Sequence, residues 1–289
     1  ALIISTSLFS QDNKLKAYLD CRCDENFIKQ ETAFIEYVRD QDLADIVIFI
    51  RDVRTPTGSR SYEIEIDGNN DFKEIIGKRF SCRSFSNKVV SRELIEKIII
   101  DAQSTASWCN SQPWKVHLVS GKKLSELKSQ LLKLAQQEKF DGSDIPYPEK
   151  YEGLYKQRRY DCGMQLYESL NIKKDDYDAR KKQSLENFKF FNAPHAAFIT
   201  SEKLLGTYGV LDCGAFITNF MNFCTYYGVD SIAQAALASF SKTVKTFLNI
   251  DEKRSLVCCI SFGIGVLNDP VNNFRTERGT IDEVLEWLD

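Results

Sequence analysis

The sequence predicts an α+β domain over residues 71–289, preceded by a small α/β unit over residues 1–70. The larger part mixes helical and strand-like segments without regular alternation, which is typical of α+β architecture. The first part has the order strand, helix, strand, strand, and the cluster "DGNNDF" at 67–72 separates the two parts. With 289 residues, 43% of them hydrophobic, the chain is long enough to bury a sizeable core.

The N-terminal unit is predicted from apolar segments separated by turn residues. "LKAYLD" (15–20) and "DIVIFIRDV" (45–53) are expected to be strands. "RTPTGSRSYEIEIDG" (54–68) is expected to be a hairpin arm, because Pro56 and Gly58 supply turn geometry before an alternating run. Between the strands we expect a helix whose apolar face comprises Phe27, Ile28, Phe34, Ile35 and Val38. The unit resembles an uncharacterised module of bacterial envelope proteins in the pattern "LDCRCDENFIKQETAFIEYVRD", which implies no chemistry.

The larger domain shows helical periodicity broken by short strands. Ser91 is a suitable N-cap for the second helix, and Gly228 can end the most apolar helix in a left-handed conformation. The proline-containing segment "DGSDIPYPEKY" (141–151) is expected to be an ordered loop or lid. Helices are predicted at 71–78, 91–106, 122–139, 152–170, 176–187, 209–227 and 242–249, and strands at 115–121, 195–201 and 255–265.

Composition argues against two classes of partner. The 38 Lys and Arg residues are balanced by 41 Asp and Glu, giving a net charge of −3, so no bulk cationic field draws the protein to nucleic acid or anionic lipid. No apolar run approaches the roughly 18 to 20 residues that span a bilayer. We therefore expect neither nucleic-acid binding nor a membrane span.

The compartment is predicted from the cysteines and the N-terminal residues, which disagree. Most of the nine cysteines lie in apolar periodic segments, where a reduced thiol behaves as a small hydrophobe, and this favours the cytoplasm. "ALIISTSLFS" (1–10) resembles the end of a secretory signal, which would place the protein in the periplasm or envelope, although it also fits a first strand or a frayed terminus. Cys21 and Cys23 are too close together for a zinc knuckle, and we expect no metal site.

The usual catalytic motifs are absent from the sequence, and two basic clusters remain. There is no Gly-x-Gly-x-x-Gly, Walker loop, His-Glu-x-x-His or Gly-x-Ser-x-Gly, and the two histidines are expected to be structural. One cluster places Arg79, Ser81 and Arg83 on alternate positions, and the other comprises Arg275 and Arg278. Arginines and a hydroxyl brought together by folding would bind a phosphomonoester, whereas separately each cluster is a solvated charged face.

The segment "CNSQPW" (109–114) presents two amides and a hydroxyl ahead of a proline and a large aromatic residue. Such a loop is able to hydrogen-bond the edge of a planar heterocycle. It also fits a polar turn after a helix, since Pro113 forbids helix continuation. The sequence alone leaves these two interpretations open.

Taken together, these motifs resemble those of the FMN-dependent nitroreductases, in particular the branch that reduces nitrobenzoate-type aromatics. The resemblance covers residues 71–289. The matching segments are Arg79, Ser81, Arg83 and Phe85; Asn110 to Trp114; "LDCGAFITNFMNFC" with Ile232 to Ala236; and Asn273 to Arg278. In the middle of the chain, "IPYPEKY", "RRYDCGMQLYESLNI" and "ENFKFFNAP" are also similar to that branch.

The resemblance implies a central mixed or antiparallel sheet flanked by helices, in a homodimer with helix 209–227 at its core. It implies an FMN oxidoreductase that takes hydride from NADH or NADPH and reduces small nitroaromatic or quinone-like acceptors by a ping-pong mechanism. No side chain is expected to be catalytic, because the flavin carries out the redox chemistry. The cofactor-binding residues it implies are Arg79, Ser81, Arg83, Arg275 and Arg278 for the phosphate and ribityl chain, Asn110 and Gln112 for the pyrimidine edge, and Ala235 and Ala236, through backbone N–H groups, for N5 and O4.

Some positions depart from the family pattern. Phe80 stands where many members have a second basic residue, Ala106 replaces a common proline, and Trp108 occupies a position that is often small. Two alternatives therefore stay open: a non-catalytic flavin-binding or adaptor protein, and a flavin-dependent reductase or dehalogenase that acts on a non-nitro substrate. No segment distinguishes NADH from NADPH.

Overall fold

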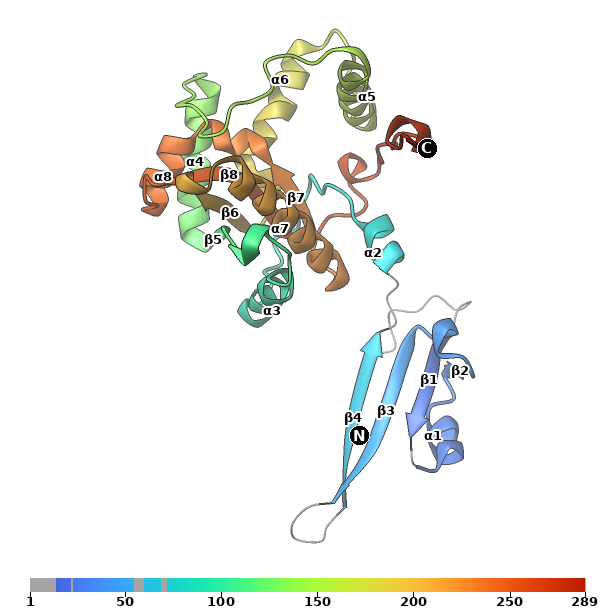
Figure 1. The fold of residues 1–289 in the computed structure, drawn as a ribbon. Helices are drawn as coiled ribbons and strands as arrows, with labels where there is room; N and C mark the ends of the chain where they lie inside the picture. Colours follow the sequence, from blue (N-terminus) through green and yellow to red (C-terminus); the bar gives the residue numbers. More distant parts are fainter. Residues whose placement is uncertain (1–13, 22, 55–59, 69–71, 289) are drawn as a thin grey trace. The chain divides into compact units, whose positions relative to one another are not determined.

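The computed structural model describes residues 14–21, 23–54, 60–68 and 72–288, which form two compact units (Figure 1). The units comprise Ala1–Ile75 and Ile76–Asp289. Their division falls inside the short helix α2 (Phe72–Lys78), a few residues after the boundary expected near residue 70. Residues 1–13, which carry the signal-like stretch, and the turn residues 55–59 lie outside the described residues.

The N-terminal unit is a four-stranded sheet with the order β2-β1-β3-β4. Strand β1 pairs in parallel with β2 and β3, and β3 pairs with β4 in an antiparallel ladder from Ile46↔Gly68 to Arg54↔Arg60. The bounds are β1 Leu15–Cys21, α1 Glu25–Glu31, β2 Ile35–Tyr37, β3 Ile46–Arg54 and β4 Arg60–Gly68. The two expected strands and the hairpin arm are confirmed.

The helix expected to extend through Val38 is wrong in its second half. Helix α1 ends at Glu31, and the chain then turns into β2, where Ile35 pairs with Leu15. Residues 34–38 combine aromatic and β-branched side chains in alternation, a composition that favours a strand once a neighbouring strand supplies its hydrogen bonds. The apolar residues of the short helix α1 and of the strand β2 together have a spacing that also fits one longer helix, which is why the sequence predicted a single helix.

One face of this sheet is packed and much of β4 is exposed. Ala17, Ile48 and Ile50 form the buried centre, whereas Ile64 and Ile66 on β4 are exposed. Cys21 and Cys23 form a disulfide at the end of β1, which differs from the reduced state that most of the cysteines were expected to have. The seven other cysteines are free, and five of them are buried: Cys82, Cys213, Cys224, Cys258 and Cys259.

The C-terminal unit is built on a second four-stranded sheet, with the order β5-β6-β8-β7 and antiparallel neighbours. Its edge strand β7 extends from Asp230 to Gln234 and was not among the strands expected from the sequence. The strands are β5 Lys115–Ser120, β6 His195–Glu202, β7 Asp230–Gln234 and β8 Arg254–Gly263. The helices are α3 Arg92–Ala102, α4 Gly121–Gln136, α5 Gly153–Ser169, α6 Tyr177–Leu185, α7 Gly206–Tyr226 and α8 Ser241–Leu248.

Strand β6 shows why the sheet is covered on both faces. Ala197 and Ile199 pack into a core with α3 and α7, whereas Ala196 and Phe198 pack into a second core with α4 and α8 (Figure 1). Successive strand residues point to opposite faces, so a strand such as β6, buried at every position but the last, needs helices on both sides. The expected α+β sheet flanked by helices is confirmed.

Helices α5 and α6 differ from α3, α4, α7 and α8, which cover the second sheet, because neither contains a buried residue. They follow the proline-containing loop 141–151 and are found at the top of the view in Figure 1. Among the described residues, no helix is both long enough and apolar enough to cross a membrane.

A buried ion pair fixes the start of the 141–151 loop. Lys245, only 2% exposed, has its Nζ atom 3.0 Å from Asp144 Oδ1 and 3.1 Å from Glu252 Oε2. Asp144 also accepts hydrogen bonds from the Ser241 hydroxyl and the Leu256 N–H. Burial alone would raise the pKa of Asp144, but these hydrogen bonds and the Lys245 ammonium outweigh it and lower that pKa.

We expect Asp144→Ala to lower the free energy of unfolding by about 3 kcal/mol, because it leaves a buried ammonium without its best partner. Urea unfolding measures the change. The control is Glu138→Gln, which breaks a solvent-exposed pair with Lys181 and should leave the free energy of unfolding nearly unchanged. Equal effects from the two substitutions would show that the buried pair of Asp144 with Lys245 does not stabilise the fold more than an exposed pair does.

The same pair predicts a pH dependence. Because the pKa of Asp144 is lower in the folded than in the unfolded protein, its stabilising contribution is present above the unfolded value of about 3.9 and is lost as the pH falls through the folded value. The difference in unfolding free energy between the wild type and Asp144→Ala should therefore shrink in acid. A difference that stays constant with pH would oppose this account.

Candidate functional site

The first basic cluster lies in an extended segment attached to the edge of the second sheet. Ser81 forms a parallel bridge with Ser231 of β7, and the Cys82 N–H donates to the Ser231 carbonyl at 3.1 Å. Cys82 is buried, whereas Arg79, Ser81 and Arg83 are partly exposed. The alternation seen in the sequence thus arises from strand-like backbone, which sends the three polar side chains away from the buried thiol.

Asn272 joins the C-terminal segment to this extended segment. Its side-chain oxygen accepts from the Arg83 N–H at 2.7 Å, and its side-chain nitrogen donates to the carbonyls of Ser84 at 2.9 Å and Val266 at 3.0 Å. Asn272 is 2% exposed, and it brings the second basic cluster beside the first. The motif expected from the sequence begins one residue later, at Asn273, so Asn272 was not among the predicted site residues.

The two basic clusters line a single cavity of about 440 Å³. Its cations are Arg79, Arg83, Arg275 and Arg278, and Ser81 and Cys162 also line it. No salt bridge to a carboxylate involves any of these four arginines within the part of the chain that the structure describes. The interpretation of the clusters as separate solvated faces therefore does not hold, since folding brings them together.

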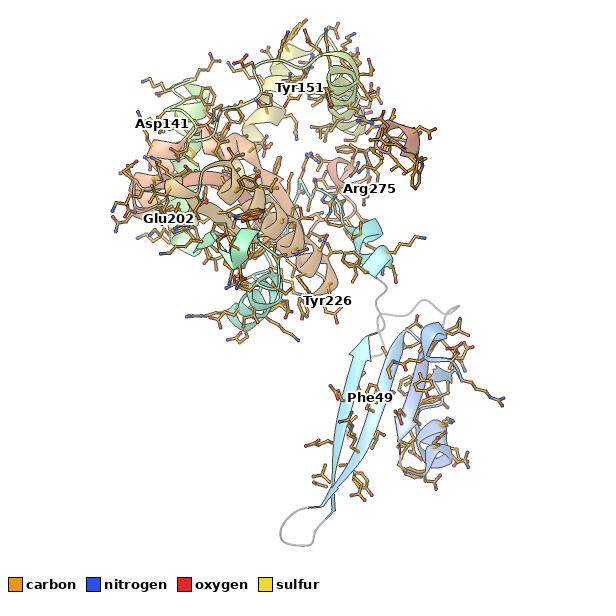
Figure 2. The ribbon with its side chains drawn as sticks, viewed as in Figure 1. Phe49, Asp141, Tyr151, Glu202, Tyr226 and Arg275 are labelled. Carbon is orange, nitrogen blue, oxygen red and sulfur yellow. A yellow bond between two sulfur atoms is a disulfide. The ribbon has the colours of Figure 1, made fainter. Side chains whose placement is uncertain are left out.

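Aromatic rings and backbone carbonyls hold the arginines in place. The guanidinium carbon of Arg275 lies 4.2 Å from the centroid of the Phe80 ring, and that of Arg83 lies 5.3 Å from Phe274 (Figure 2 labels Arg275). Arg278 donates from Nη1 to the carbonyl and hydroxyl of Thr276 at 3.1 and 2.8 Å. Partial burial, followed by the charges of Arg278 and Arg275, lowers the pKa of Arg79. Cations that repel one another in this way bind a dianion favourably.

A second cavity of about 270 Å³ shares Arg83 with the arginine cavity. It is lined by Ala235 and Ala236 at the end of β7, and by Leu166 and Tyr167 from α5. The predicted backbone residues thus lie next to the predicted basic residues.

Three side chains fix the backbone at the end of β7. The Tyr147 hydroxyl donates to the Ala235 carbonyl at 2.8 Å, and this bond connects the 141–151 loop to the second cavity. Gln234 is 2% exposed; it donates to the Asn187 carbonyl at 3.0 Å and accepts from the Ser261 hydroxyl at 2.5 Å. Both residues lie inside segments matched to the family, Tyr147 in "IPYPEKY" and Gln234 in Ile232 to Ala236, but the sequence gives neither of them a role, because their partners are distant in the chain.

Asn110 and Gln112 do not line either cavity. They lie in an exposed loop after α3, where Gln112 Nε2 donates to Asn110 Oδ1 at 3.0 Å. Cys109, Asn110 and Gln112 have φ values of 51°, 54° and 45°, which non-glycine residues adopt at a cost. Buried Asp212 of α7 holds this loop by accepting from the Trp108 N–H at 3.1 Å.

Both histidines have structural partners, in line with the expectation. His195 Nε2 accepts from the Val90 N–H at 3.0 Å, and His117 Nε2 lies 3.0 Å from the Thr200 hydroxyl. Burial lowers the pKa of both rings, that of His117 to about 4, where Lys115 and Arg254 add to the effect. Neither ring lines the two cavities.

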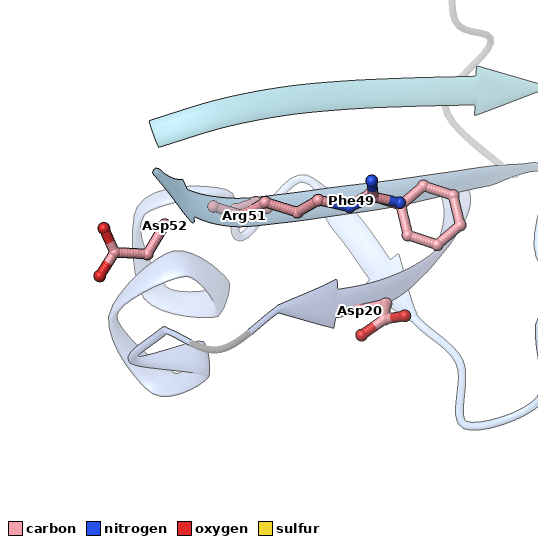
Figure 3. Close-up of a pocket in the computed structure, with 5 residues that line it drawn as sticks. Asp20, Phe49, Arg51 and Asp52 are labelled. Carbon is pink, nitrogen blue, oxygen red and sulfur yellow. The ribbon is translucent and has the colours of Figure 1, made fainter. Parts of the chain in front are cut away.

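The N-terminal unit has a cavity of its own, of about 580 Å³, over the strands β1 and β3 (Figure 3). Asp20, Phe49, Arg51 and Asp52 line it, and the Arg51 side chain extends along β3 toward the Phe49 ring, 5.9 Å from its centroid. None of the residues expected to bind a cofactor lies there.

Comparison with known proteins places this arrangement in a family. The model of the nitroreductase family matches residues 76–264. The chain belongs to the nitroreductase family. This nitroreductase chain is 31% identical over 209 residues to the 4-nitrobenzoate reductase of Pseudomonas putida, covering 72% of this chain and 92% of that protein. It is 30% identical over 221 residues to nitroreductase NfnB of Mycolicibacterium smegmatis, covering 74% and 92%.

Solved structures of nitroreductases share its fold. The crystal structure of the FMN- and NADPH-dependent nitroreductase NfnB from Sphigopyxis sp. strain HMH has a TM-score of 0.73 at 27% identity, covering 76% of this chain and 100% of that one. The FMN-dependent NfnB from Mycobacterium smegmatis in complex with NADPH has a TM-score of 0.71 at 29% identity, covering 75% and 97%. The family expected from the ordered motifs is confirmed.

Proposed function

We propose that this protein is an FMN-dependent nitroreductase that takes hydride from NADPH or NADH and passes electrons to nitroaromatic or quinone-like acceptors. The observation that carries the proposal is the pair of cavities that share Arg83. One is lined by four arginines that form no salt bridge among the described residues and are therefore suited to a phosphate, and the other by a fixed stretch of backbone beside aromatic residues. The relatives named above, one of them in complex with NADPH, support the same cofactor and donor.

The arginine cavity is assigned to the FMN phosphate and ribityl chain. Arg79, Arg275 and Arg278 supply the charge, and Ser81 adds a hydroxyl. Arg83 lines both cavities, so it would be the residue that holds the ribityl chain between phosphate and ring. Because the cations already face one another without carboxylate partners, binding the phosphate relieves their mutual repulsion.

The second cavity is assigned to the reactive edge of the flavin ring. The bound flavin supplies the redox chemistry, by accepting hydride and then delivering electrons. The backbone N–H groups of Ala235 and Ala236 are the donors proposed to face N5 and O4, where negative charge builds up. Tyr147 and Gln234 hold this backbone in position before any ligand arrives, so that no reorganisation is needed.

Donor and acceptor are proposed to occupy the second cavity in turn. The cavity measures about 270 Å³, which favours one planar ring at a time. Double-displacement kinetics with parallel lines in reciprocal plots are therefore expected. This part of the proposal also removes the need for a catalytic side chain, which agrees with the structural roles of His117 and His195.

A homodimer is proposed to complete the site. Trp108, Leu204, Tyr208 and Leu211 form an exposed apolar patch at the start of α7, with the Trp108 and Tyr208 ring centroids 5.3 Å apart. The Asn110 loop adjoins this patch. Because Asn110 and Gln112 line neither cavity of their own subunit, we assign them to the flavin of the partner subunit.

The test of the function is an absorbance spectrum of the purified protein, followed by anaerobic addition of NADPH and then NADH. Flavin bands that bleach with either nucleotide and return when a nitroaromatic is added are the expected result. A yellow protein that oxidises neither nucleotide would support a non-catalytic flavin-binding protein. Reduction by nucleotide with transfer only to a non-nitro acceptor would support the reductase or dehalogenase alternative. A colourless protein that fails to take up added FMN would refute the assignment.

The double variant Arg79→Ala/Arg278→Ala should weaken FMN binding by about 100-fold or more, since each lost charge-assisted hydrogen bond costs about 1.5–3 kcal/mol. Fluorescence titration of FMN measures the dissociation constant. The control is Arg92→Ala, which removes an exposed arginine paired with Glu96 and lining neither cavity. An affinity within about threefold of the wild type in the double variant would show that the phosphate binds elsewhere.

Light scattering should give twice the chain mass of 33.1 kDa. Leu211→Glu should shift the protein toward the monomer and release FMN, because it places a charge in an apolar interface. Tyr155→Glu, which changes an equally exposed side chain on α5, should leave the mass unchanged. A monomeric wild type with full FMN affinity would contradict the proposed dimer.

A further inference from the structure

The N-terminal unit contains a disulfide that contributes little to holding the chain together. Cys21 and Cys23 are bonded with one residue between them, and theirs is the only disulfide among the described residues. The stabilisation that a disulfide gives grows with the length of the loop that it closes, and this loop is very short. Pairing of Cys21 with Ile50 of β3 already fixes this end of β1. The bond is therefore available for reaction without loss of the fold.

The two bonded cysteines are both held in place and accessible. Cys21 and Cys23 pack against the apolar cluster that contains Ile48 and Ile50. They are nevertheless only partly buried, whereas most of the free thiols of the chain are fully buried. A disulfide reacts with a thiolate that is able to reach one of its sulfur atoms. This pair meets that requirement.

The end of β1 leaves one edge of β3 open next to the disulfide. The parallel ladder between β1 and β3 ends at Cys21↔Ile50, whereas the antiparallel ladder between β3 and β4 continues to Arg54↔Arg60. Within the described residues, β3 is therefore paired on one side only beyond Ile50. An open strand edge is a template for a further extended chain. A peptide that paired there would continue the line of β1 and would have one end against Cys21.

The cavity over β1 and β3, of about 580 Å³, adjoins this open edge and is mainly acidic. Its lining residues include Asp20, Arg51 and Asp52, which are exposed (Figure 3). Glu63 of β4, also exposed, pairs with Arg51 in the antiparallel ladder. Carboxylates thus outnumber cations around the cavity, and this favours a basic partner.

We propose that the Cys21–Cys23 disulfide is a thiol–disulfide exchange site, and that its substrate is an extended, basic peptide segment with two cysteines that pairs with the open edge of β3. This activity requires no flavin and goes beyond the proposed function. A small thiol has the same reactive group but no backbone to pair with β3, so the experiment distinguishes the two.

The exchange consists of two steps in which atoms and electrons balance. A thiolate of the peptide attacks one sulfur atom of the Cys21–Cys23 bond, which breaks; a mixed disulfide forms, and the other cysteine leaves as a thiolate and takes up a proton. The second thiol of the peptide then loses its proton and attacks the mixed disulfide, which forms the peptide disulfide and releases the remaining cysteine. Two electrons pass from the peptide dithiol to the protein disulfide.

The test adds the reduced peptide Lys-Val-Cys-Val-Cys-Val-Lys to the full-length oxidised protein without any nucleotide. Alkylation followed by mass spectrometry should find new thiols at Cys21 and Cys23 alone, and one oxidised peptide for each chain. Cys21→Ser/Cys23→Ser should oxidise no peptide, whereas the control Cys109→Ser, which removes an exposed free thiol, should match the wild type. A wild type that leaves the peptide reduced, or a double variant that oxidises it, would overturn the proposal.

Urea unfolding distinguishes a reactive disulfide from a structural one. Reduction of the wild type should leave its unfolding curve nearly unchanged, because the bond closes so short a loop. Cys21→Ser/Cys23→Ser should unfold at nearly the same urea concentration. Loss of the folded N-terminal unit on reduction would show that the bond is structural, and would refute the exchange site.

A modified peptide tests pairing with β3 separately from thiol chemistry. The same peptide methylated at its backbone nitrogens keeps both thiols but lacks the N–H groups that a strand donates. It should react about tenfold more slowly, as expected for the loss of one or two hydrogen bonds. Equal rates for the two peptides would overturn the assignment of an extended peptide, since any small thiol would then serve as well.

Charge is tested with Asp20→Asn/Asp52→Asn, which should slow the reaction of the basic peptide and make its rate less dependent on salt. The control Glu31→Gln/Glu36→Gln removes two exposed charges of the same unit that do not line the cavity, and should change neither property. If the two variants reacted equally fast at low salt, the assignment of a basic substrate would be wrong.

Discussion

Three hydrogen bonds of one buried amide, Asn272, hold two like-charged segments together. The positive charges of Arg275 and Arg278 repel that of Arg79, so electrostatics alone would drive the two segments apart. Asn272 accepts from the Arg83 N–H and donates to the carbonyls of Ser84 and Val266, which also accept from backbone N–H groups, so its loss would remove one hydrogen-bond partner from each of the three. The repulsion between the arginines is therefore offset by the hydrogen bonds that Asn272 makes with the backbone of both segments.

The sheet determines where the rest of the site lies. Because β6 is covered by helices on both faces, neither face of the sheet centre offers space for a ligand. Space remains beyond the edge strand β7, where the extended segment from Arg79, the turn at Ala235 and helix α5 converge. The cavities are thus a property of the sheet edge, and the contacts of Tyr147 and Gln234 make that edge rigid.

The sequence was informative where function depends on short local patterns. The alternate positions of Arg79, Ser81 and Arg83 marked a polar cluster, and the ordered motifs predicted the family. It was less informative where long-range pairing decides structure. The strand at Ile35 depends on Leu15, and the contact of Tyr147 with Ala235 joins residues 88 positions apart. Asn272 escaped notice because an asparagine next to another carries no periodic signal, and its value lies in partners such as Ser84.

Helices α5 and α6 contain no fully buried residue, and this has an evolutionary consequence. Substitutions at exposed positions usually change stability little, so this pair can vary in sequence at low cost to folding. The residues around Asn272 and Gln234 do not share that freedom, since each satisfies buried polar groups. Divergence among descendants of this protein should therefore concentrate in the wall formed by α5 and α6, so that new acceptors are acquired while the cofactor cavity is inherited unchanged.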